Sequence, residues 1–123
     1  MEIQVGSQQS SIEETGSDPD LTLATELVAS VNDGAAMAAT HYFDWAEELI
    51  GKRMVPLAEP FLRSSDSLVR YQAAWWLSFR KLDSDVLYEL KSVANDEAID
   101  EWARSGARVR LADVATGNWL PPR

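Results

Sequence analysis

The chain has 123 residues, no cysteine and a formal net charge of −9. This length suffices for one domain with its own core, and the lack of cysteine excludes disulfides, thiolate metal sites and cysteine nucleophiles. The acidity disfavours nucleic-acid binding, whose affinity comes largely from neutralising phosphates. It favours encounter with a basic protein partner, although negative charge also simply keeps many domains soluble.

Residues 1–17 are rich in Gln, Ser and Glu, which predicts a polar N-terminal tail without a signal-peptide pattern. No apolar run approaches the roughly 20 residues that a membrane span needs. We therefore expect a cytoplasmic protein that does not contact a membrane, with a single domain over residues 18–123.

The predicted domain begins with Asp18-Pro19-Asp20, a typical helix start, and its first helix stops at Asn32-Asp33-Gly34. A second helix over residues 35–50 is amphipathic. Its polar face is predicted to carry Met37, His41, Asp44, Glu47 and Glu48.

A third helix is predicted over residues 54–63, and Pro60 in its interior should kink or split it. The next stretch, residues 66–81, has no Gly or Pro and is apolar over more than half of its helical circumference. Such a helix needs neighbours on two flanks. The narrow strip left for solvent consists of Arg70, Ala74, Ser78 and Lys81.

Two further helices are predicted over residues 84–94 and 97–115. After Gly117, Trp119 and Leu120 are expected to fold back as a cap on this last pair. The final helix is expected to bury Ile99, Trp102, Ala103, Gly106, Ala107, Val109 and Val114.

Six helices in three short-looped pairs suggest antiparallel hairpins, and an internal offset of 30 residues supports a repeat. The offset relates residues 66–77 to residues 96–107. It aligns Asp66, Val69, Ala73 and Leu77 with Asp96, Ile99, Ala103 and Ala107.

The pattern Asp-x-x-Val-Arg-x-x-Ala-Ala over residues 66–74 resembles the turn and second helix of a HEAT-like repeat. The resemblance covers residues 54–82 well, residues 84–115 less closely, and residues 20–50 only in architecture. It implies an all-α, right-handed stack of about three antiparallel helical hairpins. It also implies that Arg70 links neighbouring repeats and that the second helices line the concave surface.

The sequence offers little catalytic chemistry. His41 is the only histidine, and Asp44, Glu47 and Glu48 are more typical of a solvated helix face than of an acid pair. There is no phosphate-binding glycine loop, zinc-ligand spacing or nucleophile motif. We predict no catalytic, cofactor-binding or metal-binding residues.

The five tryptophans are more informative, because Trp is favoured at interaction hot spots. Trp76 and Trp102 fall on predicted core arcs, whereas Trp45 and Trp119 are candidates for exposed anchors. For each Trp taken singly, filling a gap between stacked hairpins is the favoured interpretation.

The exposed residues of the second helices predict a groove that grades from acidic to basic and suits a protein partner with a basic surface. Alternatively, Arg70 and Arg104 could form internal ion pairs with Asp100 or Glu101. The candidate partner-binding residues are Trp45, Asp44, Glu48, Arg70, Lys81, Arg104 and Arg108.

Together these features predict a non-catalytic protein-binding domain that uses no cofactor. The sharper hypothesis is a bacterial immunity or inhibitor protein that occludes a toxin or effector. The alternatives are a structural adaptor or regulatory subunit, an enzyme-associated module, and a viral inhibitor that mimics nucleic-acid charge.

Overall fold

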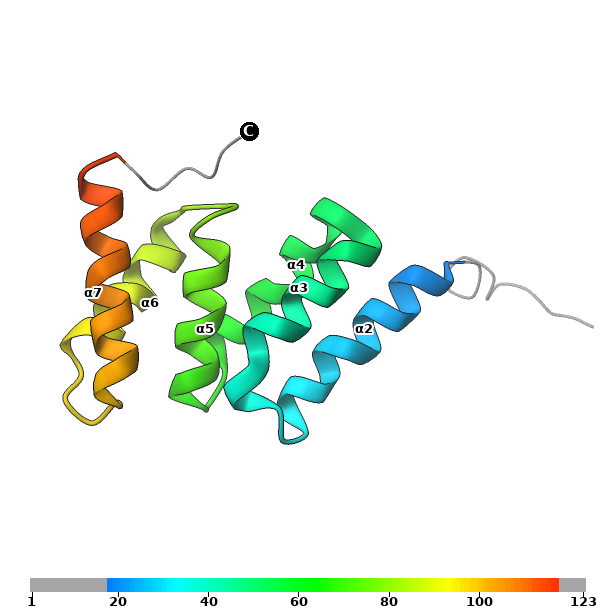
Figure 1. Cartoon of the computed structure of the whole chain (residues 1–123), viewed down its shortest axis with the longest axis horizontal. Helices are drawn as coiled ribbons and strands as arrows, with labels where there is room; N and C mark the ends of the chain where they lie inside the picture. The colour runs from blue at the N-terminus through cyan, green and yellow to red at the C-terminus, as the bar shows by residue number, and fades with distance from the viewer. Residues whose placement is uncertain (1–17, 118–123) are drawn as a thin grey trace, which may run out of the picture.

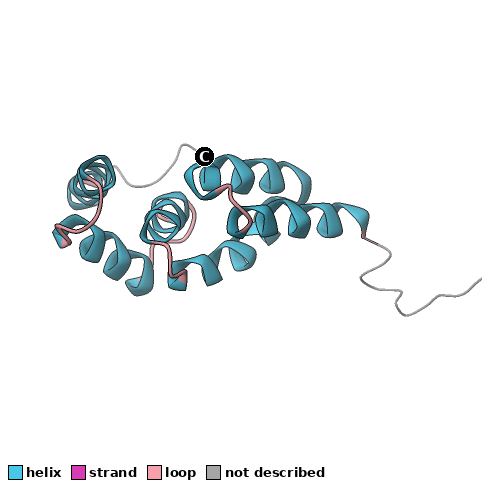
Figure 2. Cartoon of the chain, turned by 90° about the horizontal axis from the view of Figure 1, so that it is seen from below, coloured by secondary structure: helices cyan, strands magenta, loops and turns pink. Residues whose placement is uncertain are grey.

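The computed structural model describes residues 18–117, and in this range the secondary structure is helical throughout, with no strand (Figure 2). The predicted all-α class is therefore confirmed. Within the same range, no helix combines the length and apolar character that crossing a membrane requires. The predicted tail over residues 1–17 and the predicted cap by Trp119 and Leu120 lie outside the described residues.

Three of the α-helices within residues 18–117 begin at side-chain caps. Asp18, Asp66 and Asp83 each accept a hydrogen bond from a backbone N–H in the first turn of the helix that follows. The α-helices are α2 (Pro19–Asn32), α3 (Ala39–Ile50), α4 (Met54–Ala58), α5 (Ser67–Leu77), α6 (Ser84–Asn95) and α7 (Glu101–Ala115). Short 3₁₀ segments are η1 (Ala36–Ala38), η2 (Gly51–Arg53) and η3 (Glu59–Arg63).

Consecutive helices pack as hairpins: α2 against α3, η3 and α4 against α5, and α6 against α7 (Figure 1). The central helix α5 also contacts α3 on one side and α6 and α7 on the other. It therefore has neighbours on two flanks, as its broad apolar surface predicts. The right-handed twist implied by the HEAT-like resemblance stays a prediction.

Residues related by the 30-residue offset occupy equivalent positions in two hairpins. Asp66 and Asp96 each accept a hydrogen bond from the backbone N–H two residues later. All three aligned apolar pairs are buried: Val69 and Ile99, Ala73 and Ala103, and Leu77 and Ala107. The 30-residue offset therefore relates residues that are equivalent in packing as well as similar in type.

Pro60 splits the third predicted helix, as expected. α4 ends at Ala58, and the chain continues as the 3₁₀ segment η3 from Glu59 to Arg63. Proline lacks the N–H that an α-helical hydrogen bond needs, and its ring clashes with the preceding turn. The chain can therefore change direction here before it enters α5.

The predicted exposed strip on the central helix is wrong. α5 ends at Leu77, so Ser78 and Lys81 follow the helix instead of lying on it. Ala74 and Ser78 are completely buried, and Arg70 is only partly exposed. The physical reason is that Arg110 on α7 reaches Ser78 and donates a hydrogen bond to its hydroxyl.

The predicted start and buried face of the last helix also need correction. α7 begins at Glu101, after a turn over residues 96–99, and not at residue 97. Trp102 is 46% exposed and Val109 is 62% exposed. The helix instead turns Ala103, Ala107 and Arg110 inward. The small side chains of Ala103 and Ala107 let α7 approach its neighbours closely, which leaves Trp102 and Val109 outside.

Candidate functional site

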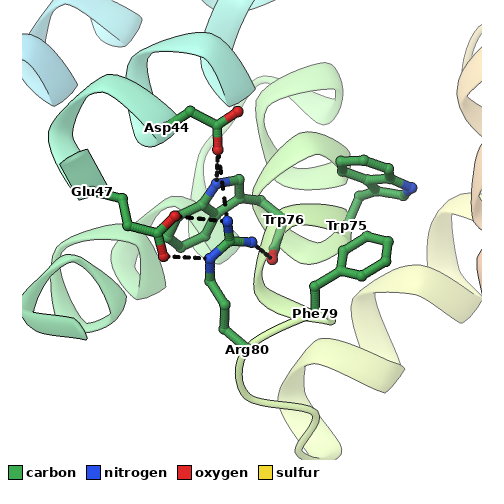
Figure 3. A pocket seen from close by; sticks show the side chains of 6 residues that line it. All are labelled: Asp44, Glu47, Trp75, Trp76, Phe79 and Arg80. Atoms are coloured by element: carbon green, nitrogen blue, oxygen red, sulfur yellow. Dashed lines mark hydrogen bonds and ion pairs between the residues drawn. The ribbon is translucent and has the colours of Figure 1, made fainter. Parts of the chain in front are cut away.

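A cavity of about 490 Å³ opens between α3 and the C-terminal end of α5 (Figure 3). A second cavity, of about 220 Å³, shares Trp75 with the first and reaches α7, so together they connect the three second helices. The first is lined by Asp44, Glu47, Trp75, Trp76, Phe79 and Arg80. The second is lined by Met37, Thr40, Tyr71, Gln72, Trp75 and Trp102.

Arg80 lies in the turn after α5 and closes one side of the first cavity. Its Nε and Nη2 donate to the two carboxylate oxygens of Glu47 at 2.7 and 2.8 Å, and its Nη1 donates to the Trp76 carbonyl at 2.7 Å. The guanidinium also stacks over the Trp76 ring, 3.6 Å from its centroid. The charge of Arg80 is therefore already paired within the chain.

Asp44 has an open acceptor at the same cavity. Its Oδ1 accepts the indole N–H of Trp76 at 2.8 Å and lies 3.6 Å from Arg80 Nη2. Its Oδ2 forms no hydrogen bond with any residue of the 18–117 range, and the side chain is 56% exposed. With two carboxylates and one guanidinium, the cavity lining keeps one net negative charge.

The apolar walls of the cavity are aromatic. Trp75 and Phe79 meet edge to face with ring centroids 4.9 Å apart, while Trp76 is buried against Phe43. Arg80 covers the Trp76 ring, and Arg110 of α7 lies 3.6 Å from the centroid of Phe79. Among the described residues, no guanidinium covers Trp75, so this indole is the aromatic surface that remains for a ligand.

The structure separates the candidate residues predicted on α3. Asp44 lines the first cavity, whereas Trp45 and Glu48 line neither of the two. Trp45 is 49% exposed, as predicted for an anchor, and its ring packs against Tyr42 and His41. Glu48 is exposed and has no ion pair in the described part of the chain.

Arg70 is used internally, although not with the predicted acids. Its Nε donates to Glu89 of α6 at 3.0 Å, and its Nη1 donates to the Ser64 carbonyl at 2.7 Å. This contact joins one hairpin to the next, as the HEAT-like resemblance implies. The pairing with Asp100 or Glu101 that we considered for Arg70 is wrong.

Lys81 also forms ion pairs within the chain. It pairs with Glu59, and its ammonium lies 3.4 Å from Asp83. The hydrogen bond to Glu59 is the main reason that the pKa of Lys81 is raised above its ordinary value. This cation therefore ties the turn after α5 to η3 and to the start of α6.

At the far end of the groove, two arginines converge on one acid. Arg104 pairs with Glu101 at 2.6 Å, as one alternative predicted, and Arg108 lies 3.4 Å from the same carboxylate. A hydrogen bond from Ser105 and the charge of Arg104 lower the pKa of Glu101 below its ordinary 4.5. Within residues 18–117, one of the two positive charges at the predicted basic end of the groove is therefore compensated by the chain itself.

Gln72 and Arg110 are residues that sequence reasoning missed. Gln72 is 4% exposed, and its side chain accepts from Thr40 N–H and donates to the Ala36 carbonyl. Arg110 is 2% exposed and donates to the hydroxyl and the carbonyl of Ser78. The sequence signal that could have found them is a constant spacing between polar residues. The hydrogen-bonded pairs Thr40 and Gln72, Asp44 and Trp76, and Ser78 and Arg110 are each 32 residues apart.

The arrangement suits binding. Aromatic walls beside an unpaired carboxylate can hold a group that is partly apolar and partly cationic. Within residues 18–117, no three His, Asp or Glu side chains are placed to hold a metal ion.

Comparison with known proteins does not identify the chain, since no family model, no curated protein and no solved structure matches it.

Proposed function

We propose that the chain is a non-catalytic protein-binding domain whose partner docks on the aromatic face, defined as Met37, Trp75, Phe79 and Trp102. The observation that supports this is the exposure of large apolar side chains beside the two cavities. Met37 is 63% and Trp102 is 46% exposed, and Trp75 and Phe79 are partly exposed. Aromatic residues and Met are enriched at the centres of protein interfaces.

The charge distribution favours a partner with a basic surface. The chain carries a net charge of −9. On α3, Glu48 has no ion pair among the described residues, and Asp44 lies 3.6 Å from Arg80, which is already bound to Glu47. The cations Arg70, Lys81 and Arg104, by contrast, are paired within the chain. Such an imbalance speeds encounter with a cationic surface and disfavours polyanions.

The specific role that we propose is that of a bacterial immunity or inhibitor protein that covers the basic active site of a toxin or effector. An acidic domain can act in this way without catalytic residues of its own, because occlusion requires only a complementary surface. This identity is supported by charge and architecture, and by no motif.

Co-expression with the products of the adjacent genes tests this role. We expect one of these products to arrest growth when expressed alone, and to co-purify with this chain in a stoichiometric complex when both are present. W102A should weaken the complex at least tenfold, since interface Trp residues are frequent hot spots. W45A is the matched control, because Trp45 is similarly exposed but lies outside the two cavities.

Two results contradict the proposal. If no neighbouring product is toxic or bound, and the chain instead co-purifies with a large constitutive assembly, it is an adaptor. If W45A abolishes binding and W102A does not, the partner docks elsewhere than on the aromatic face.

A further inference from the structure

We propose that the cavity between α3 and α5 is a subsite for one arginine or lysine side chain of the partner. The inference rests on the proposed protein-binding function and adds the chemistry of the group that the partner inserts. It is supported by the shape of the cavity, its charge and an internal precedent.

The shape fits a long side chain with a charged end. The cavity has a volume of about 490 Å³, with the rings of Trp75 and Phe79 on one side and Asp44 on the other (Figure 3). The methylene groups of a lysine or arginine can pack along the aromatic rings while the cation reaches the carboxylate. A wholly apolar side chain would leave the carboxylate without a partner.

The charge of the cavity selects a cation. Both oxygens of Glu47 are occupied by Arg80, so the pair contributes little net charge. Asp44 keeps Oδ2 without a hydrogen bond in the 18–117 range. An incoming cation therefore meets a carboxylate that Arg80, 3.6 Å away, compensates only in part, and the ring of Trp75, which no guanidinium of the described residues covers.

Arg80 provides the precedent. Its guanidinium already combines a tryptophan face, that of Trp76, with a carboxylate, that of Glu47. Trp75 and Asp44, which line the same cavity, are a second tryptophan and a second carboxylate. A second guanidinium or ammonium would thus repeat an arrangement that these helices already hold.

The Asp44 carboxylate is also held in place before any ligand arrives. Its Oδ1 accepts the indole N–H of Trp76, which is 1% exposed and packed against Phe43. A group that is ordered beforehand loses little conformational entropy on binding. This makes Asp44 a better cation receptor than Glu48, whose carboxylate has no hydrogen bond or ion pair within residues 18–117 to hold it.

The test is an NMR titration of the full chain with acetyl-Leu-Arg-Leu-amide, monitored at the indole N–H signals of Trp75 and Trp76. The control peptide replaces arginine with citrulline, which has nearly the same shape but no charge. We expect the arginine peptide to bind about five- to tenfold more tightly, since an exposed ion pair and a cation–π contact each contribute modestly. This preference should decline at high salt.

D44N should remove the preference for arginine, and its amide oxygen can still accept the Trp76 N–H. E48Q is the matched control, because it removes the same charge from the same helix outside the cavity, and it should keep the wild-type preference. A thermal melt of each variant verifies that the fold is intact.

Equal affinity for the two peptides, an unchanged preference in D44N, or no indole shift at millimolar peptide would overturn the subsite. The proposed function fails separately, when no neighbouring product is bound in co-expression. A partner that binds wild type and D44N equally well, but binds W102A weakly, would remove the subsite and leave the proposed function in place.

Discussion

The α3–α5 contact and the α5–α7 contact are built from the same kinds of interaction but have opposite exposure. In each, a hydrogen bond joins two side chains that are 32 residues apart, one of them on α5 or in the turn that follows it. In each, an arginine also stacks on an aromatic ring, 3.6 Å from its centroid. The Arg80 side chain is 25% exposed beside an open cavity, whereas Arg110 is 2% exposed.

The difference comes from the residues between the helices. On the α7 side, a Cβ added at Gly106 would lie 2.0 Å from the Tyr71 hydroxyl, and Ala103 and Ala107 are fully buried. This part of the contact is therefore closed, while Tyr71 and Trp102 also line the smaller cavity. On the α3 side, the helices meet through the large rings of Phe43 and Trp76 and leave a cavity beside them. The α5–α7 contact is therefore the more buried of the two, and the α3–α5 contact keeps the open cavity in which we propose that a partner side chain binds.

The largest effect is expected from breaking the closed contact with R110A. The substitution removes a buried side chain, its hydrogen bonds to Ser78 and its packing on Phe79. The free energy of unfolding should fall by about 3 kcal/mol, measured by urea denaturation. R108A, at a residue that is half exposed, should change it by less than about 0.5 kcal/mol. Similar losses in both variants would show that Arg110 is not a special part of this contact.

A somewhat smaller loss is expected for G106A, which tests how tightly the closed contact is packed. Gly to Ala inside a helix usually stabilises it, but a Cβ at Gly106 would lie 2.0 Å from the Tyr71 hydroxyl oxygen. We expect a net loss of about 1–3 kcal/mol by overpacking. Y71F in the same chain should restore part of it, because the clashing oxygen is gone. Stabilisation by G106A alone would contradict this account.

At the α3–α5 contact, Q72A should lower the free energy of unfolding by about 1–2 kcal/mol. It leaves the Thr40 N–H and the Ala36 carbonyl without the Gln72 partner in a part-buried setting. The matched control is N95A, which removes an exposed amide that bonds only within its own helix. If Q72A and N95A lower the free energy of unfolding by the same amount, the hydrogen bonds of Gln72 to Thr40 and Ala36 do not contribute to stability.

The smallest effect concerns Glu101, the first residue of α7. In the folded chain the pKa of its carboxyl is lowered below the ordinary 4.5. A carboxyl with a lowered folded-state pKa adds stability above its unfolded pKa and loses that contribution as the pH falls through the folded value. The stability linked to Glu101 should therefore be complete above about pH 4.5 and decline below it. S105A, which removes the main cause, should raise the Glu101 pKa in a carboxyl NMR titration. An unchanged pKa would contradict the assignment.

Local signals predicted much of the fold. Asp18 and Asp66 cap helices, Pro60 splits one, and the 30-residue offset marks equivalent buried positions. These features depend on a few neighbouring residues, which a sequence displays directly. The all-α class and the two-sided burial of α5 follow from them.

The rotation of each helix was harder to predict, because it depends on which partner lies opposite. The apolar pattern predicts that Trp102 is in the core. In the structure the small residues Ala103 and Ala107 form the close helix contact, and Trp102 lies outside it. The open cavity was not predicted either, because helical periodicity continues through Lys81 while the helix ends at Leu77. Arg80 could be placed against Glu47 only once that turn was known.

The spacing of about 32 residues between hydrogen-bonded residues on neighbouring hairpins also has a consequence for folding. The side-chain bonds that join α3, α5 and the turn after α5 span 32 to 36 residues, and the bond from Ser78 to Arg110 on α7 spans 32. Each link therefore closes a loop about one hairpin long, so every hairpin can dock on its predecessor without waiting for distant segments. We expect rapid folding, and we expect α5, which alone contacts both α3 and α7 among the described helices, to be the last element to lose its protection from hydrogen exchange.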